Sequence, residues 1–254
     1  MELQVSAMTS VWSCGGGTQS AAIAALICRG SIQPPDYAVI ADTGMERSTT
    51  WKYMDEVLFP ALISVGVTLI KVKAADYATV GVWGGKEDRS ILIPAFTSIN
   101  GGAGKLPNFC SYEWKRRVVE RYMRAQGVSK YESWIGFSTD EMRRVSASVP
   151  GPRTTRYPLI ELGMRRGDCI AEVLRMGWPA PPRSSCWMCP NMGPREWREV
   201  MQSEDAEKAI SFDREIRKTD PDIWLTQEMK PLTECNFENA TGDLFGCESG
   251  ECFV

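Results

Sequence analysis

The chain of 254 residues contains no histidine, and its 29 Lys and Arg against 32 Asp and Glu give a net charge of −3. Without histidine no Ser-His-Asp triad, Cys-His dyad or H-E-x-x-H zinc site can form, so proton transfers must use Asp, Glu, Lys, Tyr, Cys or the substrate. A hydrophobic content of 43% suits a globular core. No apolar run is long enough for a membrane helix and the start lacks a basic secretory leader, so we expect a cytoplasmic protein with no membrane partner.

Short apolar stretches alternate with amphipathic ones along the first half of the chain. Strands are expected where β-branched and aromatic residues cluster, and helices where apolar residues recur every three or four positions. In chain order we expect a strand at Met8–Ser13, a helix ending near Gly30, a strand within Pro35–Gly44, a helix over 49–62, a strand at Val67–Ala74, a basic helix at Tyr112–Gly127 and a strand at Tyr131–Ser138. This alternation predicts an α/β fold with a doubly wound, mostly parallel sheet.

The remaining segments are less periodic. Val80–Asn108 is rich in glycine, and a segment of that length without regular structure is more typical of a cover over a substrate site than of filler. Beyond Pro150 we expect short helices among prolines, followed by two longer helices over 192–202 and 204–218.

Charge is distributed unevenly along the chain. Lys105–Arg183 holds fifteen Lys and Arg and eight Asp and Glu, a balance of +7, whereas Ser203–Val254 holds five and thirteen, a balance of −8. A basic middle and an acidic end favour an anionic substrate held in the middle of the chain. Solvated helix faces that happen to cluster are the alternative explanation.

A glycine-rich turn, SCGGGTQSA, stands between the first expected strand and the first expected helix. The backbone N–H groups of such a turn and the positive end of the helix suit a phosphate or sulfate oxyanion. The residues expected to contact the anion are Ser13, Gly15, Gly16, Gly17, Thr18 and Ser20. The spacing fits neither the Walker loop nor G-x-G-x-x-G, so a tight turn without a ligand stays the alternative.

In the reducing compartment expected for this protein, nine cysteines favour metal ligands or reactive thiols over a disulfide framework. Cys186 and Cys189 stand two residues apart, a spacing that lets one turn present both sulfurs to one metal centre. Cys28 and Cys169 lie in apolar helical stretches, and we expect both in the core.

Two segments resemble motifs of the phosphoadenylyl-sulfate and adenylyl-sulfate reductases, in the adenine nucleotide alpha-hydrolase-like superfamily. The glycine turn is similar to their oxyanion loop, with Gln19 at its glutamine, and to the SGGKDS loop of ATP pyrophosphatases. ADTGMERSTTW is similar to their D-T-G segment, in which Asp42, Thr43 and Gly44 match. The resemblance implies that these residues line an adenine nucleotide site, and it extends over roughly Met8–Met192.

Adenylyl-sulfate reductases bind a [4Fe–4S] cluster through a Cys-Cys pair followed by Arg-Lys and, later, a C-x-x-C. CSYEWK supplies Cys110 and, at the lysine position, Lys115, but the second cysteine is replaced by Ser111. The resemblance therefore implies a cluster on Cys110, Cys186 and Cys189, with a fourth position that is open or filled by Cys235, Cys14 or a tail cysteine. Zinc is the rival, and it would need a fourth thiolate, a carboxylate or water.

Between these cysteines, WIGFSTDEMRRVSAS resembles the family's Trp-x-x-Gly strand with its downstream arginine. Arg143 or Arg144 is therefore implied as a ligand of the anionic part of the nucleotide, beside Lys115. The planar guanidinium group suits phosphate and sulfate.

Sulfonucleotide reductases end in Glu-Cys-Gly-Leu-His, and the cysteine of that tail attacks the sulfate sulfur. The tail here is GCESGECFV, so Cys252 occupies the position of the nucleophile, the terminal histidine is missing, and Cys247 is added five residues earlier. The separation permits a Cys247–Cys252 disulfide after one round of thiol chemistry. An acidic tail with incidental cysteines is the alternative.

These resemblances imply a sulfonucleotide-reductase-like enzyme. We expect residues 1–200 to form the α/β nucleotide-binding domain with the metal cysteines, and 201–254 a helical extension with the acidic tail. The expected partners are an adenine sulfonucleotide or ATP and a thiol reductant protein; nucleic acid and homo-oligomer formation stay open. The alternatives are an ATP-dependent enzyme that thiolates or otherwise modifies nucleic acid, with a zinc or iron–sulfur site, and a non-catalytic nucleotide or redox sensor.

Overall fold

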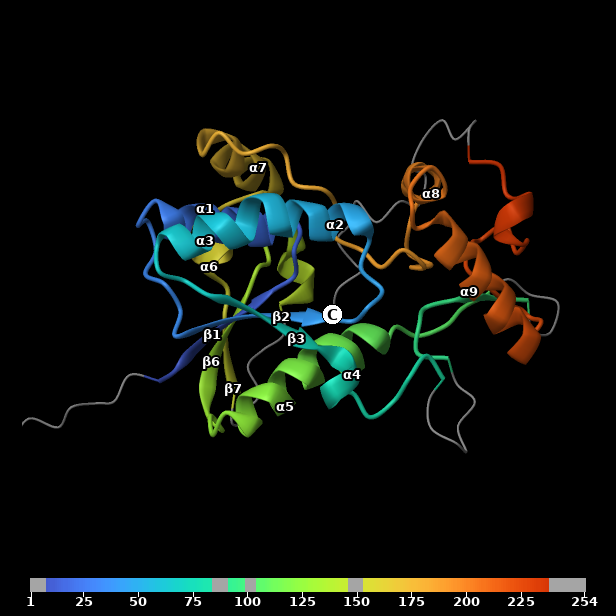
Figure 1. The fold of residues 1–254 in the computed structure, drawn as a ribbon, viewed down its shortest axis with the longest axis horizontal. Coiled ribbons are helices and arrows are strands. Elements are labelled where there is room, and N and C mark those ends of the chain that lie inside the picture. The colour runs from blue at the N-terminus through green and yellow to red at the C-terminus, as the bar shows by residue number, and fades with distance from the viewer. Residues whose placement is uncertain (1–7, 84–90, 99–103, 146–152, 238–254) are drawn as a thin grey trace, which may run out of the picture. The chain divides into compact units, whose positions relative to one another are not determined.

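The computed structural model describes residues 8–83, 91–98, 104–145 and 153–237 (Figure 1). They fall into two compact units that interleave along the chain. The sheet unit comprises residues up to Asp42, Thr50–Tyr77 and Val118–Ser184, and the cysteine unit comprises Thr43–Thr49, Ala78–Arg117 and the residues from Ser185 onward. The division expected at residue 200 stays a prediction.

A five-stranded parallel sheet forms the centre of the sheet unit, in the order β3-β2-β1-β6-β7. Its strands are β1 Ser10–Cys14, β2 Tyr37–Asp42, β3 Leu69–Lys73, β6 Tyr131–Ile135 and β7 Arg153–Arg156. The chain adds β2 and β3 on one side of β1, then returns to add β6 and β7 on the other. Ligands of doubly wound sheets bind at such a reversal, outside the carboxyl ends of the strands. The expected α/β fold is confirmed.

Helices cover both faces of this sheet (Figure 1). One face is covered by α1 Thr18–Cys28, α3 Phe59–Ser64, α6 Pro158–Glu161 and α7 Arg166–Arg175, and the other by α4 Ala74–Tyr77 and α5 Arg117–Ala125. The alanine-rich α1 is buried almost all round because it contacts α3, α6 and α7 as well as the sheet. In the described part of the chain, no helix combines the length and apolar character that crossing a membrane requires.

The cysteine unit is built around a small antiparallel sheet and two helices. Its strands, in spatial order, are β5 Gly104–Lys105, β4 Phe96–Thr97 and β8 Ile223–Trp224, and its helices include α8 Pro194–Met201 and α9 Ala206–Thr219. Ile91, Leu92 and Ile93 are buried in its core beside Trp197. Burial of these apolar side chains makes Ile91–Ile93 part of the core, and the role of Val80–Asn108 as a substrate cover stays a prediction.

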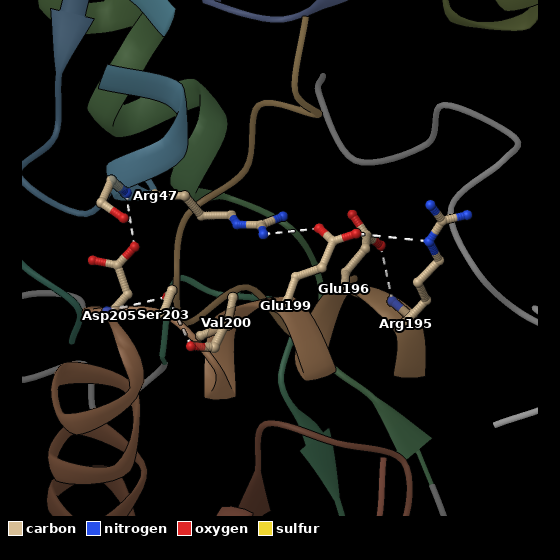
Figure 2. Close-up of polar contacts among 9 residues, drawn as sticks. Arg47, Arg195, Glu196, Glu199, Val200, Ser203 and Asp205 are labelled. Carbon is tan, nitrogen blue, oxygen red and sulfur yellow. Dashed lines mark hydrogen bonds and ion pairs between the residues drawn. The ribbon is translucent and has the colours of Figure 1, made fainter. Parts of the chain in front are cut away.

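Two polar contacts anchor the segment Thr43–Thr49 within the cysteine unit. Arg47, which is 4% exposed, donates a hydrogen bond to Glu199 of α8 at 2.9 Å (Figure 2). Asp205 accepts one from the backbone N–H of Ser48 at 2.7 Å and one from Lys208 at 3.0 Å. Ser48 begins α2 Ser48–Tyr53, and the N–H groups of a first helical turn have no partner inside the helix. The buried carboxylate of Asp205 supplies that partner from another segment.

Asp205→Asn is expected to lower the free energy of unfolding by about 2 kcal/mol at neutral pH, because it removes two charge-assisted hydrogen bonds. Burial alone raises the pKa of Asp205, but the hydrogen bonds from Ser48 and Lys208 outweigh burial and hold the pKa below its usual value. A carboxyl group whose pKa is lowered by folding contributes stability above its unfolded-state pKa and loses that contribution as the pH falls through its folded-state pKa.

The stability difference between wild type and Asp205→Asn should therefore shrink as the pH falls below about 4. Urea unfolding over a pH series measures it. The exposed Asp55 offers a control, and Asp55→Asn should change stability by less than about 0.5 kcal/mol. A deficit of Asp205→Asn that is the same at every pH would contradict the assignment.

Candidate functional site

The glycine turn follows β1 and leads into α1 within the sheet unit. Gly16 has a φ of +72°, and a Cβ there would lie 3.0 Å from Cγ2 of Thr50. A Cβ on Gly17 would lie 3.1 Å from Cβ of Ser184. The hydroxyl of Ser20 accepts a hydrogen bond from the N–H of Gly15 at 2.8 Å. The turn is thus fixed at the N-terminus of an eleven-residue helix, where backbone N–H groups favour an anion.

Gln19 and Arg144, two residues predicted to lie at the nucleotide site, both contact a buried carboxylate. Glu141, which is 7% exposed, accepts a hydrogen bond from Nε2 of Gln19 at 2.9 Å and pairs with Arg144. The guanidinium of Arg144 also stacks over the ring of Phe137 at 4.2 Å. Arg143 is exposed on the same 3₁₀-helix, Thr139–Arg144. Glu141 therefore neutralises the charge of Arg144. The same carboxylate brings Gln19 and Arg144 together.

Arg166 adds a cation to the glycine turn. Its Nη2 lies 3.4 Å from Oγ1 of Thr18, the first residue of α1. No local pattern singles it out, because Arg166 belongs to the start of α7, far along the chain. The guanidinium group of Arg166 places positive charge at the N-terminal end of α1, where the glycine turn presents its N–H groups.

The D-T-G motif is divided between the two units. Asp42 ends β2 in the sheet unit, and its Oδ2 lies 3.2 Å from Nζ of Lys71, which also lies 3.5 Å from the ring centre of Trp51. Thr43 and Gly44 belong to the cysteine unit, where the hydroxyl of Thr43 accepts a hydrogen bond from the N–H of residue 45 at 3.2 Å. Gly44 has a φ of +71°, which favours glycine.

Cys110, Cys186 and Cys189 all lie in the cysteine unit and are near enough to affect one another electrostatically. A charge on Cys110 raises the pKa of both Cys186 and Cys189. The N–H of Cys189 donates to the carbonyl oxygen of Cys186 at 3.2 Å, and Sγ of Cys110 donates to Oδ1 of Asn108 at 3.1 Å. All three thiols pack against the hydrophobic core of this unit, although they come from two distant segments of the chain.

Burial keeps these thiols protonated. It is the largest influence on all three, raising the pKa of Cys189 to about 12, that of Cys186 well above its usual value, and that of Cys110 by a smaller amount. Thiolates bind metals, so a metal centre at this place would have to displace the protons as it binds.

Lys115 compensates the negative charge of Glu46 in the cysteine unit. Its Nζ lies 2.7 Å from Oε1 of Glu46, whose side chain is 3% exposed. Burial lowers the pKa of Lys115, but the charges of Glu46 and Cys186 outweigh it and hold the pKa above its usual value. The ammonium group in turn lowers the pKa of Cys110 and Cys186.

The described residues contain no group of three or more Cys, Asp or Glu side chains arranged to hold a metal ion. By residue type, the three thiols could supply the thiolates that zinc and iron–sulfur clusters both use. The buried carboxylate of Glu46 and the ammonium group of Lys115 belong to the same unit.

The other described cysteines have separate surroundings. Cys235 lies 3.5 Å from Oγ1 of Thr226 and donates to the carbonyl oxygen of Pro231, and burial raises its pKa. Cys28 and Cys169 pack with the core of the sheet unit as expected, and burial raises the pKa of Cys169 to about 12. Cys247 and Cys252 lie outside the described residues.

No protein-family model matches this sequence, and no curated protein matches it. Among solved structures, the chain is similar to phosphoadenylyl-sulfate reductase from Candida auris in a phosphate complex, with 13% identity, a TM-score of 0.44, and coverage of 70% of this chain and 78% of that one. It is also similar to the U34-tRNA thiolase NcsA from Methanococcus maripaludis with its [4Fe–4S] cluster, with 15% identity, a TM-score of 0.43, and coverage of 85% and 67%. The phosphate and the cluster are features of those two proteins.

Gly16→Ala should destabilise the protein by about 1–3 kcal/mol, because alanine is strained at this positive φ and its Cβ would press on Thr50. Gly15→Ala is the matched control, since a Cβ there would meet only Oγ of Ser20 at an ordinary 3.7 Å. The control should stay within about 0.5 kcal/mol of wild type. Denaturant unfolding of both variants measures the difference, and equal stabilities would show that the turn does not need glycine at position 16.

Lys115→Met should cost about 3 kcal/mol or more, because it leaves the carboxylate of Glu46 buried without its cation. Glu46→Gln in the same chain should recover much of that loss, since the remaining side chain is neutral. A double-mutant cycle measured by urea unfolding gives the coupling energy between the two residues. A coupling near zero would mean that the ion pair does not hold the two side chains together.

Proposed function

We propose that this protein is a sulfonucleotide-reductase-like enzyme, which binds an adenine nucleotide at the glycine turn and carries an iron–sulfur cluster on Cys110, Cys186 and Cys189. The observation that carries the proposal is the gathering of these three thiols with Lys115 in one unit. The order of the sequence motifs, from the glycine turn to the C-x-x-C, supports it independently.

The position of the glycine turn supports the nucleotide site. It follows β1, the strand at which the order of the parallel sheet reverses, where doubly wound folds bind their ligands. The end of α1 offers N–H groups and a positive dipole to a phosphate or sulfate group. Arg166 adds a full charge beside Thr18.

The tail cysteine supplies the chemistry in this proposal. The thiolate of Cys252 attacks the sulfate sulfur of a sulfonucleotide, a Cys–S–SO₃⁻ bond forms, and the adenine nucleotide leaves with the electron pair of the broken S–O bond. A second thiolate, from Cys247 or a reductant protein, then attacks Sγ of Cys252 and releases sulfite. Two thiols are oxidised to one disulfide while the sulfur is reduced by two electrons.

The cluster would add iron-based positive charge and a redox couple to the cysteine unit. Within the chain, Lys115 holds a proton at Nζ and keeps Glu46 compensated, while Cys110, Cys186 and Cys189 supply thiolates once their protons are displaced. The glycine turn orients the oxyanion through its N–H groups.

Anaerobically purified protein should show the broad visible absorption of a thiolate-bound cluster, with iron and sulfide present. It should release sulfite from an adenine sulfonucleotide in the presence of a dithiol protein. Cys252→Ser should lose sulfite release and keep the cluster, whereas Cys186→Ser should lose the cluster. Cys28→Ser, at a half-buried core cysteine of the sheet unit, is the control and should keep both.

Three outcomes would favour the alternatives. A colourless, zinc-loaded protein would remove the iron–sulfur cluster from the proposal. Release of pyrophosphate from ATP that depends on DNA or RNA, with salt-sensitive binding of the polymer, would indicate nucleic-acid modification. Nucleotide binding without turnover of any donor would indicate a sensor.

A further inference from the structure

Glu46 carries a buried carboxylate oxygen for which the ion pair with Lys115 does not account. The residue is 6% exposed, and Oε1 is bound to Lys115 at 2.7 Å. Oε2 has no hydrogen-bond partner among the described residues. Buried carboxylate oxygens are normally satisfied, so an unpartnered one in a native fold calls for a ligand or another specific explanation.

Backbone pairing places this carboxylate beside a cysteine. Glu46 and Cys186 are partners in an isolated antiparallel bridge. Two backbone hydrogen bonds flank this pair. The N–H of Trp187 donates to the carbonyl oxygen of Met45 at 2.9 Å, and the N–H of Arg47 donates to the carbonyl oxygen of Ser185 at 3.1 Å. Glu46 and Cys186 are therefore a non-hydrogen-bonded pair, the arrangement in which opposite side chains come closest and project from the same face.

Arg47, the next residue along the chain, fixes the face on which the side chain of Glu46 lies. Side chains alternate along an extended strand, so Arg47 points away from the face that Glu46 occupies. Arg47 is buried and bound to Glu199 of α8 (Figure 2). Because a rotation of the segment would have to break that ion pair, Glu46 is held on the face that Cys186 occupies.

The three thiols and Glu46 belong to one region of the cysteine unit. Cys110, Cys186 and Cys189 pack against its hydrophobic core, and Lys115, five residues after Cys110, binds Glu46. A buried region that collects thiols and a carboxylate favours a bound cation.

We propose that Glu46 is the fourth protein ligand of the cluster, a carboxylate bound to the iron that Cys110, Cys186 and Cys189 leave without a thiolate. This inference rests on the proposed iron–sulfur centre and deepens it. Lys115 is then a positioning residue, which orients the carboxylate by binding its other oxygen, as hydrogen-bond donors commonly do for carboxylates that bind metals.

The test uses the full chain reconstituted with iron-57 and sulfide without oxygen, and its readouts are spectroscopic. Mössbauer spectra of wild type should contain a minority iron site that differs from the thiolate-bound sites, because one iron has an oxygen ligand. In Glu46→Cys the minority signal should disappear, because every iron then has a thiolate ligand. In Glu46→Gln the fourth iron should be lost to mild oxidation about tenfold faster than in wild type, with the electron paramagnetic resonance signal of a [3Fe–4S] cluster.

Glu196→Gln is the matched control. Glu196 is also buried, its charge also raises the pKa of a cluster cysteine, Cys189, and its carboxylate accepts a hydrogen bond from the N–H of Gly193 at 3.0 Å. The control removes one buried negative charge from the same unit and should leave the minority iron site and its retention unchanged. Circular dichroism of each variant verifies folding, and Glu46→Cys keeps the test informative if Glu46→Gln does not fold.

Failure of this inference can be told apart from failure of the proposed function. A cluster in wild type with the same iron sites and the same retention in Glu46→Gln would overturn the assignment of Glu46 and leave the cluster in place. Wild type that binds zinc in place of iron would overturn the proposed cluster, and an unchanged zinc affinity in Glu46→Gln would then remove Glu46 as a ligand. Wild type that binds neither metal would overturn both.

Discussion

The pairing of Glu46 with Cys186 is the constraint on which the cysteine unit depends. Two backbone hydrogen bonds fix the register, and that register decides that a carboxylate, and not the neighbouring Arg47, faces the sulfurs. A shift by one residue would place the guanidinium on that face and break its ion pair with Glu199. A short stretch of main-chain pairing between distant segments thereby sets the chemical character of the site.

That register places a buried carboxylate opposite a thiol, and the neighbouring residues compensate its charge. Burial disfavours charged thiolates and carboxylates, so Cys186 and Cys189 are held as neutral thiols, while Glu46 needs the ammonium group of Lys115. Cys110 comes from the segment that also carries Lys115, so one stretch of chain contributes both a sulfur and the compensating charge.

The fold of the sheet unit was predictable because its elements are local patterns. The alternating strands and the alanine-rich α1 could be identified from periodicity. β7 was not identified, because the edge strand Arg153–Arg156 reads RTTR and buries too little to show an apolar alternation. Burial of Ile91–Ile93 in the cysteine unit was equally hidden, since its packing partners come from segments far away in the sequence.

The sequence by itself determined the residue types available for the site: it has no imidazole, it has a C-x-x-C pair, and its motif order adds Cys110 and Lys115. Tertiary structure alone decided that Glu46 lies opposite Cys186, and that Arg144 is bound to Glu141. The reason is physical: Coulomb interaction and desolvation depend on distance and burial in space, and neither quantity is encoded in the spacing of residues along the chain.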